Sequence, residues 1–416
     1  MAEKELREII SHTINSVLPE NAVKKHISKF SEIQNNNKIF LLSIGKAAWR
    51  MANAAKEILK DKIKDGIVIT KYKHSLGKID SLEIFEAGHP IPDENSLNAT
   101  KIAIERIKKL PDDYIILFLI SGGGSALFEM PEDNITLHDI QNITDQLLKS
   151  GAEINEINMI RKRLSRVKGG KFANLIYPKN IYALVLSDVL GDNLESIASG
   201  PAYPDKYTYN DVLNVIKKYE LNINDKILSL LKKETPKNIQ NAKHIIIGSV
   251  RLACEEAIKK AKELGYNTLL LTSILNAEAK EAGKIFAGIA KEIITTGNPL
   301  KPPAAIIAGG ETIVYVKGTG YGGRNQELSY SFAIDIEGFE NVYFSSFGTD
   351  GTDGPTDAAG GIVNGKTITK IRKKGLDPEI YLENNDTYNG LSEGEALLKT
   401  GPTGTNVNDI MILLVD

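Results

Sequence analysis

The stretch "DYIILFLISGGG", residues 113–124, decides the fold class of this 416-residue chain. Six apolar residues, Ile115 to Ile120, lead directly into three glycines with a serine on each side. A continuously apolar strand is typical of a parallel sheet that is covered on both faces. Glycines after such a strand let a ligand approach the backbone and can present several N–H groups to an anion. The pattern is not a Walker A loop, and the predicted anion-binding residues are Ser121, Gly122, Gly123, Gly124 and Ser125.

The same pattern recurs along the whole chain. Apolar runs at 38–45, 65–70 and 180–189 alternate with helical stretches, and a second such series begins with "HIIIGS" at 244–249. This alternation indicates an α/β fold with doubly wound, mostly parallel sheets. Ligands of such sheets bind beyond the carboxyl ends of the strands. We therefore expect the Gly, Ser, Asp and Lys residues that follow these runs to lie along one rim.

The length predicts two domains, at roughly 150 residues per domain. A polar, lysine-rich helical stretch at about 205–242 resembles a connector between them. We place the boundary near residue 240 and expect two α/β/α domains, 1–240 and 241–416, each with a mostly parallel sheet.

Composition excludes several classes of function. The formal net charge of −2 argues against a general nucleic-acid binder. The single cysteine, Cys254, excludes an intramolecular disulfide and a cysteine-cluster metal site. No apolar stretch reaches the ~18 residues of a membrane-spanning helix, and the first residues have no signal-peptide core. We expect a cytoplasmic protein with neither nucleic-acid nor membrane partners.

Two further loops carry charge next to predicted strands. Lys46 in "SIGKAA" (43–48) lies where a strand passes into a helix, and a helix N-terminus attracts anions but disfavours an unpaired lysine. Asp188 lies at the end of the predicted strand segment at 180–189, directly after its apolar residues, and Asp192 comes four residues later. Carboxylates beside phosphate-binding loops often hold Mg²⁺. The sequence therefore predicts an anion contact for Lys46 and a metal site at the two aspartates.

The basic run "INMIRKRLSRVKGGK" (157–171) has a weaker signal. Charge runs are usually solvated, but Arg163 and Arg166 are three residues apart and can share one helical face. We expect Arg163 to contact an anionic substrate.

The stretch "GGETIVYVKGTGYGGRNQELS" (309–329) contains a formal GxGxxG at Gly318, Gly320 and Gly323. A dinucleotide fold needs an acidic residue about 20 positions on, and small apolar residues after the last glycine. Polar residues follow instead, and the nearest candidate acid, Asp350, lies in a later loop. We favour a flexible loop that presents Arg324 and Asn325 to a charged ligand.

The loop "SSFGTDGTDGPTDAAGG" (345–361) carries Asp350, Asp353 and Asp357. Position twelve from Asp350 is Gly361, whereas a calcium EF-hand requires glutamate there. The loop instead suits Mg²⁺-bound phosphate or substrate hydroxyls. The sequence does not distinguish the roles of the three aspartates.

Taken together, these stretches resemble the glycerate 2-kinase family, whose C-terminal portion is known as the MOFRL domain. The resemblance runs through nearly the whole chain. It rests on the following segments: "SIGKAAWRMA", "AGHPIPDENSL", "LISGGGSAL", "EINMIRKRLSRVKGGKFA", "LSDVLGDNLESIASGPAYPD", "GGETIVYVKGTGYGGRNQELSYSFA" and "SFGTDGTDGPTDAAGG".

The resemblance implies ATP-dependent phosphorylation of D-glycerate to 2-phosphoglycerate. It also implies a cleft between a Rossmann-like N-terminal domain and a MOFRL-type C-terminal domain, with Lys46 and Arg324 as the critical pair. We expect ATP and Mg²⁺ as cofactors and a homodimer. Members of the family have often been labelled hydroxypyruvate reductases, so an NAD(P)-dependent reductase is the alternative. A non-catalytic sugar-acid or phosphate binder is a second alternative.

We assign roles on this basis. Lys46 and Arg324 would neutralise charge on the transferring phosphoryl group. Asp188, with Asp192 or Asp350, would hold Mg²⁺, and either Asp188 or Asp353 would accept the substrate proton. The glycine loop would hold the ATP phosphates or the glycerate carboxylate. The expected substrate contacts are Arg163, Asn325, Asp350 and Asp353.

Overall fold

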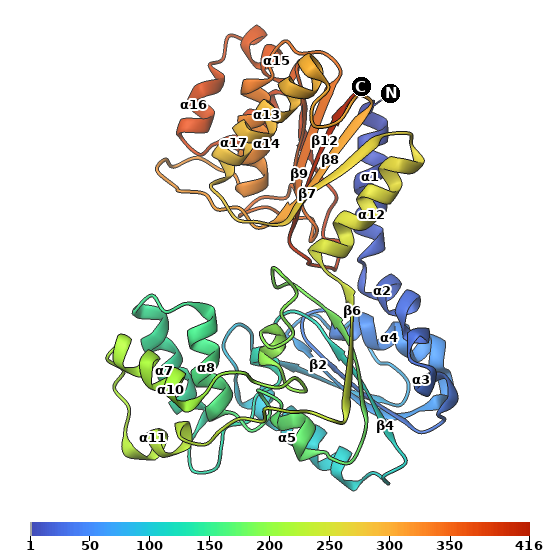
Figure 1. Ribbon diagram of the computed structural model, residues 1–416, viewed down its shortest axis with the longest axis vertical. Helices are drawn as coiled ribbons and strands as arrows, with labels where there is room; N and C mark the ends of the chain where they lie inside the picture. Colours follow the sequence, from blue (N-terminus) through green and yellow to red (C-terminus); the bar gives the residue numbers. More distant parts are fainter. Residues whose placement is uncertain (1) are drawn as a thin grey trace. The chain divides into compact units, whose positions relative to one another are not determined.

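The computed structural model describes residues 2–416 and divides into two compact units (Figure 1). One unit is Pro19–Ile247. The other combines the segment that ends at Leu18 with Gly248–Asp416. Within residues 2–416, no helix has the length and apolar character that a bilayer crossing requires.

The sheet of Pro19–Ile247 has the strand order β3-β2-β1-β4-β5-β6. Its strands are β1 (Ile39–Ile44), β2 (Ile63–Lys71), β3 (Leu82–Ala87), β4 (Ile115–Ile120), β5 (Ile181–Leu186) and β6 (Ala242–Gly248). The pairs β3–β2, β2–β1, β1–β4 and β4–β5 are parallel. The strand order reverses between β1 and β4, which is the position where open α/β sheets bind their ligands.

Helices cover this sheet because its central strands are apolar along their whole length. Every residue of β1, β4 and β5 is buried. The accompanying helices are α2 (Pro19–His26), α3 (Ser31–Asn35), α4 (Ala48–Leu59), α5 (Glu94–Lys109), α6 (Gly124–Leu127) and α9 (Lys171–Leu175). Phe118 of β4 packs against Phe128 and Phe172, with ring centroids 6.1 and 5.2 Å away. This core anchors the base of the glycine loop.

Four more helices of this unit gather beside the sheet: α7 (Leu137–Lys149), α8 (Ile154–Leu164), α10 (Tyr209–Lys218) and α11 (Asp225–Leu231) (Figure 1). They share a core of their own that includes Leu147, Ile160, Val212 and Leu231. The stretch 205–242, which we expected to be a connector, therefore belongs to this helical layer. Its apolar residues pack on α8, so it does not behave as a linker.

The sheet of the second unit has the order β11-β10-β9-β12-β8-β7. Its strands are β7 (Asn267–Leu275), β8 (Ala304–Gly310), β9 (Val342–Gly348), β10 (Gly360–Asn364), β11 (Leu397–Leu398) and β12 (Asp409–Val415). Figure 1 places α1 (Ala2–Ser16) and α12 (Val250–Glu263) on one face. The other face carries α13 (Ala279–Thr296), α14 (Arg324–Asp335), α15 (Thr367–Lys373), α16 (Pro378–Glu383) and α17 (Thr387–Glu393).

The expected α/β fold in two domains is confirmed, but the second sheet is mixed. Of its recorded pairings only β7–β8 is parallel. The terminal strand β12 inserts between β8 and β9 and runs antiparallel to both, and β9–β10 and β10–β11 are also antiparallel. All seven residues of β12 are buried. We took continuous apolarity as a sign of parallel strands. It indicates only that a strand is buried on both faces, whether the strand is parallel or antiparallel to its neighbours.

The division of the chain also differs from 1–240 and 241–416 in two places. The run at 244–249 forms β6 of the first sheet, beside β5, and Ile181 N–H donates to Asn241 O just before it, at 2.7 Å. The helix α1 packs on α12 of the second unit. Leu6 and Ile9 are buried there, and Thr405 Oγ1 donates to Val17 O at 2.7 Å.

Candidate active site

Lys46 lies in the turn between β1 and α4, at the reversal of the strand order. Its backbone N–H donates to Gly122 O at 2.8 Å, and Ala47 N–H donates to Ser121 Oγ at 3.1 Å. The lysine turn and the glycine loop are therefore joined directly. Within residues 2–416 the Lys46 ammonium has no hydrogen bond or ion pair, so it is available to an anionic ligand.

The glycines of this loop are required by close packing. A Cβ at Gly122 would overlap the Asp188 carboxylate. Gly123 has a φ of +85°, and a Cβ there would lie 2.9 Å from the His89 ring. Burial, and next the charge of Lys46, lower the pKa of His89, which favours a neutral ring at pH 7. The loop thus brings Lys46, Asp188 and His89 around one stretch of backbone.

The two serines of the loop support it from within. Ser121 Oγ donates to Ile44 O at 3.2 Å, and the Ser125 and Ser199 hydroxyls are 2.8 Å apart. Ser199 Oγ in turn donates to Asn158 Oδ1 at 3.1 Å. Both hydroxyls therefore already have partners in the protein, and this geometry does not support their expected role in an anion cradle.

Two cations below the loop were missing from our sequence-based site. The Lys168 ammonium donates to Ser125 O at 2.7 Å and Phe128 O at 3.0 Å, and lies 3.2 Å from Glu129 Oε2. Arg161 Nη2 also donates to Ser125 O, at 3.2 Å. Burial lowers the pKa of Lys168 to about 8, although Glu129 opposes this effect. These contacts satisfy carbonyls at the end of α6. In the sequence, the basic run at 157–171 was the feature that indicated these two cations.

The expected metal ligands occupy different positions. Asp188 is only partly buried, follows β5 and lies against Gly122. Asp192 lies beyond the next turn with a φ of +55°, and its N–H donates to Val189 O at 3.1 Å. Residues 2–416 contain no cluster of three His, Cys, Asp or Glu side chains arranged for a metal. Mg²⁺ is usually held by one or two carboxylates together with substrate phosphates, so Asp188 fits such a site.

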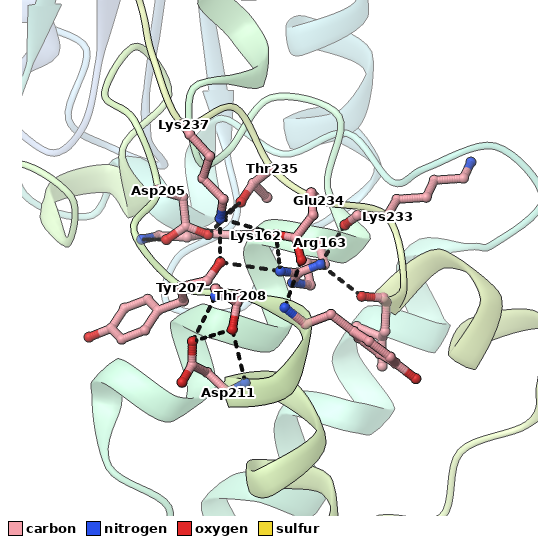
Figure 2. A network of polar contacts seen from close by, with 12 residues as sticks. Lys162, Arg163, Asp205, Tyr207, Thr208, Asp211, Lys233, Glu234, Thr235 and Lys237 are labelled. Carbon is pink, nitrogen blue, oxygen red and sulfur yellow. Dashed lines mark hydrogen bonds and ion pairs between the residues drawn. The ribbon is translucent and has the colours of Figure 1, made fainter.

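Arg163 does not have the environment of a substrate contact (Figure 2). It is 1% exposed, and its guanidinium donates to Leu231 O at 2.9 Å and Lys233 O at 2.5 Å. It also donates to Tyr207 O at 3.2 Å and Glu234 Oε2 at 2.8 Å. The arginine therefore ties the chain before and after α10 and α11 to α8. We withdraw the substrate role, because a side chain on the buried face of α8 cannot also face an open loop.

In the second unit, a cavity of about 680 Å³ opens between the loop before α14 and the loop after β9. Its lining includes Gly322, Gly323 and Arg324 from one loop and Thr349, Asp350 and Asp353 from the other. Asn385 and Asp409 complete it. Carboxylates outnumber cations in this lining.

Arg324 is the first residue of α14, and two carboxylates hold it. Nε and Nη2 donate to the two oxygens of Asp409 at 2.6 and 3.2 Å, and Nη1 donates to Glu311 Oε1 at 2.8 Å. Burial raises the pKa of Asp409, although Arg324 opposes this effect. Our sequence-based site lacked Asp409 and Glu311. Asp409 begins β12 and Glu311 follows the end of β8. Because these neighbouring strands are antiparallel, the start of one lies beside the end of the other, and the two carboxylates come together.

Asp353 caps the N-terminus of α14. Its carboxylate accepts from Asn325 N–H at 3.2 Å and Gln326 N–H at 2.9 Å. Burial raises its pKa to about 7, and these bonds oppose the rise. Asn325 is 1% exposed, and its Oδ1 accepts from Ser346 Oγ at 2.6 Å. Asn325 therefore braces the helix start, and its expected substrate contact has no support from this geometry.

The other two aspartates of this loop also have protein partners. Asp350 Oδ1 accepts from Thr352 N–H at 3.0 Å, and its Oδ2 accepts from Asn406 at 3.3 Å. Asp357 accepts from Tyr388 Oη at 2.7 Å and Lys399 Nζ at 3.0 Å. Of the two, only Asp350 lines the cavity.

The glycines of the formal GxGxxG pack against protein. A Cβ at Gly318 would overlap Asn384, a Cβ at Gly320 would overlap Asp386, and a Cβ at Gly323 would overlap Asp353. The three glycines of this pattern are therefore needed because the backbone packs closely against other parts of the protein. This geometry removes the reason for assigning it to a dinucleotide.

Comparison with known proteins supports one family. Residues 5–232 match a family model described as a domain of unknown function, DUF4147, and residues 304–409 match the MOFRL family. A curated relative from Thermotoga maritima, named D-glycerate 2-kinase, is 52% identical over 98% of this chain and 97% of its own length. A relative from Agrobacterium vitis, named putative hydroxypyruvate reductase, is 36% identical over 100% of this chain and 94% of its own length.

A crystal structure of a glycerate kinase from Thermotoga maritima has the same fold. It superposes with a TM-score of 0.96 at 52% identity and covers 100% of this chain and 99% of its own. The relative with the kinase name is the more similar of the two curated proteins. The chain belongs to the MOFRL family of glycerate 2-kinases.

Proposed function

We propose that this protein transfers the γ-phosphoryl group of ATP to the C2 hydroxyl of D-glycerate. The observation that carries the proposal is the Lys46 ammonium, which has no hydrogen bond or ion pair among residues 2–416 and adjoins a glycine backbone at the reversal of the strand order. Phosphoryl transfer requires positioning and charge neutralisation more than covalent chemistry. A preformed cation beside backbone N–H donors supplies both.

We assign the anion cradle to the backbone of Gly122 and Gly123, since Gly124 N–H already donates to Ser121 O at 3.3 Å, and the charge stabilisation to Lys46. Arg324, which the family resemblance pairs with Lys46, is the second cation. Its two carboxylate partners hold it in one orientation before substrate arrives. Asp188 is the better candidate for the proton acceptor, because both oxygens of Asp353 are bonded to the start of α14.

Mg²⁺ would be held by Asp188 together with substrate phosphates, and when bound it would neutralise charge on those phosphates. Asp188 can serve as metal ligand or as proton acceptor in this scheme. Its contact with Gly122 places the carboxylate beside the cradle in either case.

A coupled ADP-release assay with D-glycerate, with and without Mg²⁺, tests this function. We expect turnover that requires the metal and a product identified as 2-phosphoglycerate. ADP release without a glycerate phosphate, or oxidation of NADH by hydroxypyruvate at a comparable rate, would contradict it. The homodimer and the cytoplasmic location stay predictions, and light scattering of the purified chain tests the dimer.

A further inference from the structure

The loop that leads to Arg324 is fastened to a segment about 65 residues later in the chain, Asn384–Asp386. Lys317 N–H and Gly318 N–H both donate to Asn385 Oδ1, at 2.8 and 3.0 Å. The next three N–H groups have partners in the same segment. Thr319 N–H donates to Asn384 Oδ1 at 3.0 Å, Gly320 N–H to Asn384 O at 2.9 Å and Tyr321 N–H to Asp386 Oδ1 at 2.9 Å. Five consecutive backbone donors therefore end on three residues.

Of the three residues in this segment, Asn385 also forms a hydrogen bond to α14. Its Nδ2 donates to Glu327 Oε2 at 2.9 Å. Glu327 is 2% exposed and lies in the first turn of the helix, three residues after Arg324. One amide side chain thus holds the loop before the arginine and the helix after it.

The loop needs an external support of this kind. Residues 311–323 between β8 and α14 contain no helix and only an isolated bridge at Ile313, and Lys317, Thr319 and Tyr321 are exposed. A loop without its own secondary structure samples many conformations unless other parts of the protein bind its backbone. Asn385 itself has a φ of +53°, so the chain holds a left-handed backbone at this position.

We propose that Asn385 is a positioning residue for the reaction, which acts by holding the segment that presents Arg324. This inference rests on the role given to Arg324 in the proposed function. It adds a residue that our sequence-based site lacked and explains why the glycine-rich loop binds protein rather than phosphate. The N–H groups of this loop already have acceptors in the protein, and these bonds hold the loop that precedes Arg324.

The test uses Asn385→Gly in the full-length protein, because glycine accepts the positive φ and removes only the side chain. The matched control is Asn341→Gly. Asn341 has a φ of +61°, belongs to the same unit, is exposed and lies outside the cavity lining. We expect Asn385→Gly to lower kcat about tenfold and to speed hydrogen exchange in peptides covering 315–323, and Asn341→Gly to change neither.

A double-mutant cycle separates positioning from a general structural effect. In an Arg324→Ala background, Asn385→Gly should change the remaining kcat less than about twofold, because the group it positions is absent. Full kcat in Asn385→Gly, or an equal loss in both backgrounds, would overturn the inference. If Asn385→Gly does not fold, Asn385→Asp replaces it. That change keeps the acceptor for the loop and turns the bond to Glu327 into a repulsion, so wild-type kcat would again overturn the inference.

The same series distinguishes this inference from the proposed function. Absence of glycerate-dependent ADP release in the wild-type protein, or full activity of Arg324→Ala, counts against the proposed function and removes the inference with it. Loss of activity in Arg324→Ala with an unaffected Asn385→Gly counts against the inference alone.

Discussion

Two glycine-rich loops follow strands in this protein, and their backbones differ in their hydrogen-bond partners. The loop at 121–125 follows β4 at the reversal of the first sheet, beside the Lys46 ammonium, for which the described part of the chain offers no partner. The loop at 318–323 precedes α14, and its N–H groups through Tyr321 are bonded to Asn384–Asp386. Glycine count does not separate the two. The two loops differ in the partners of their backbone N–H groups and of the neighbouring cation. In the second loop both have partners in the protein, so the first loop is the better candidate for binding phosphate.

The largest effect should come from removing the cation of the first loop. Lys46→Ala is expected to lower kcat by on the order of 10² or more, as is typical when transition-state charge stabilisation is lost. Steady-state kinetics measures this, and circular dichroism checks the fold. Lys78→Ala, at an exposed lysine of the same unit, is the control. Turnover near the wild-type rate in Lys46→Ala would remove Lys46 from the mechanism.

A matched pair of glycine substitutions tests the comparison itself. A Cβ at Gly122 overlaps the Asp188 carboxylate, and a Cβ at Gly320 overlaps Asp386. We expect Gly122→Ala to lower kcat about tenfold or more with little change in Tm, because a partly exposed carboxylate can move away. Gly320→Ala should lower the free energy of unfolding by ~1–3 kcal/mol, which is typical of overpacking.

Thermal unfolding and kinetics on both variants provide the measurement. If Gly320→Ala lost its activity while Gly122→Ala kept the wild-type kcat, the second loop would be the better candidate for binding phosphate.

The third prediction concerns the cap on α14. Because burial raises the pKa of Asp353 to about 7, the folded state holds this proton more tightly than the unfolded state. Stability from this group is therefore present below the usual aspartate pKa and is lost as pH rises towards 7, by on the order of 1.4 kcal/mol per pH unit at most.

Chemical denaturation at pH 4.5 to 7.5 measures this slope. Asp353→Asn cannot titrate and should flatten the profile. An unchanged slope in Asp353→Asn would show that another group causes it.

The sequence predicted the fold class and the position of the first glycine loop directly after β4, because both depend on local signals. Apolar runs such as 115–120 identify buried strands, and glycines next to them identify the rim. Asp353 and Asn325 were assigned to substrate because the sequence shows residue types but not which backbone they meet. Asp353 caps a helix that begins 29 residues earlier in the chain, and the sequence does not show that the fold brings the loop after β9 to the start of this helix. Arg163 was misassigned for the same reason, since its acceptors lie between 44 and 71 residues later.

The smallest effect is expected at Asp357, although the sequence places it in the same acidic loop as Asp350 and Asp353. Its partners Tyr388 and Lys399 are on the surface, and their contacts lower its pKa. Exposed ion pairs contribute little to stability because water and salt screen them. Asp357→Asn should leave kcat within about twofold of wild type and Tm nearly unchanged, and added salt should not alter that result. A large loss of kcat would place Asp357 in the site and would mean that ligand binding rearranges the wall of the cavity around Pro355.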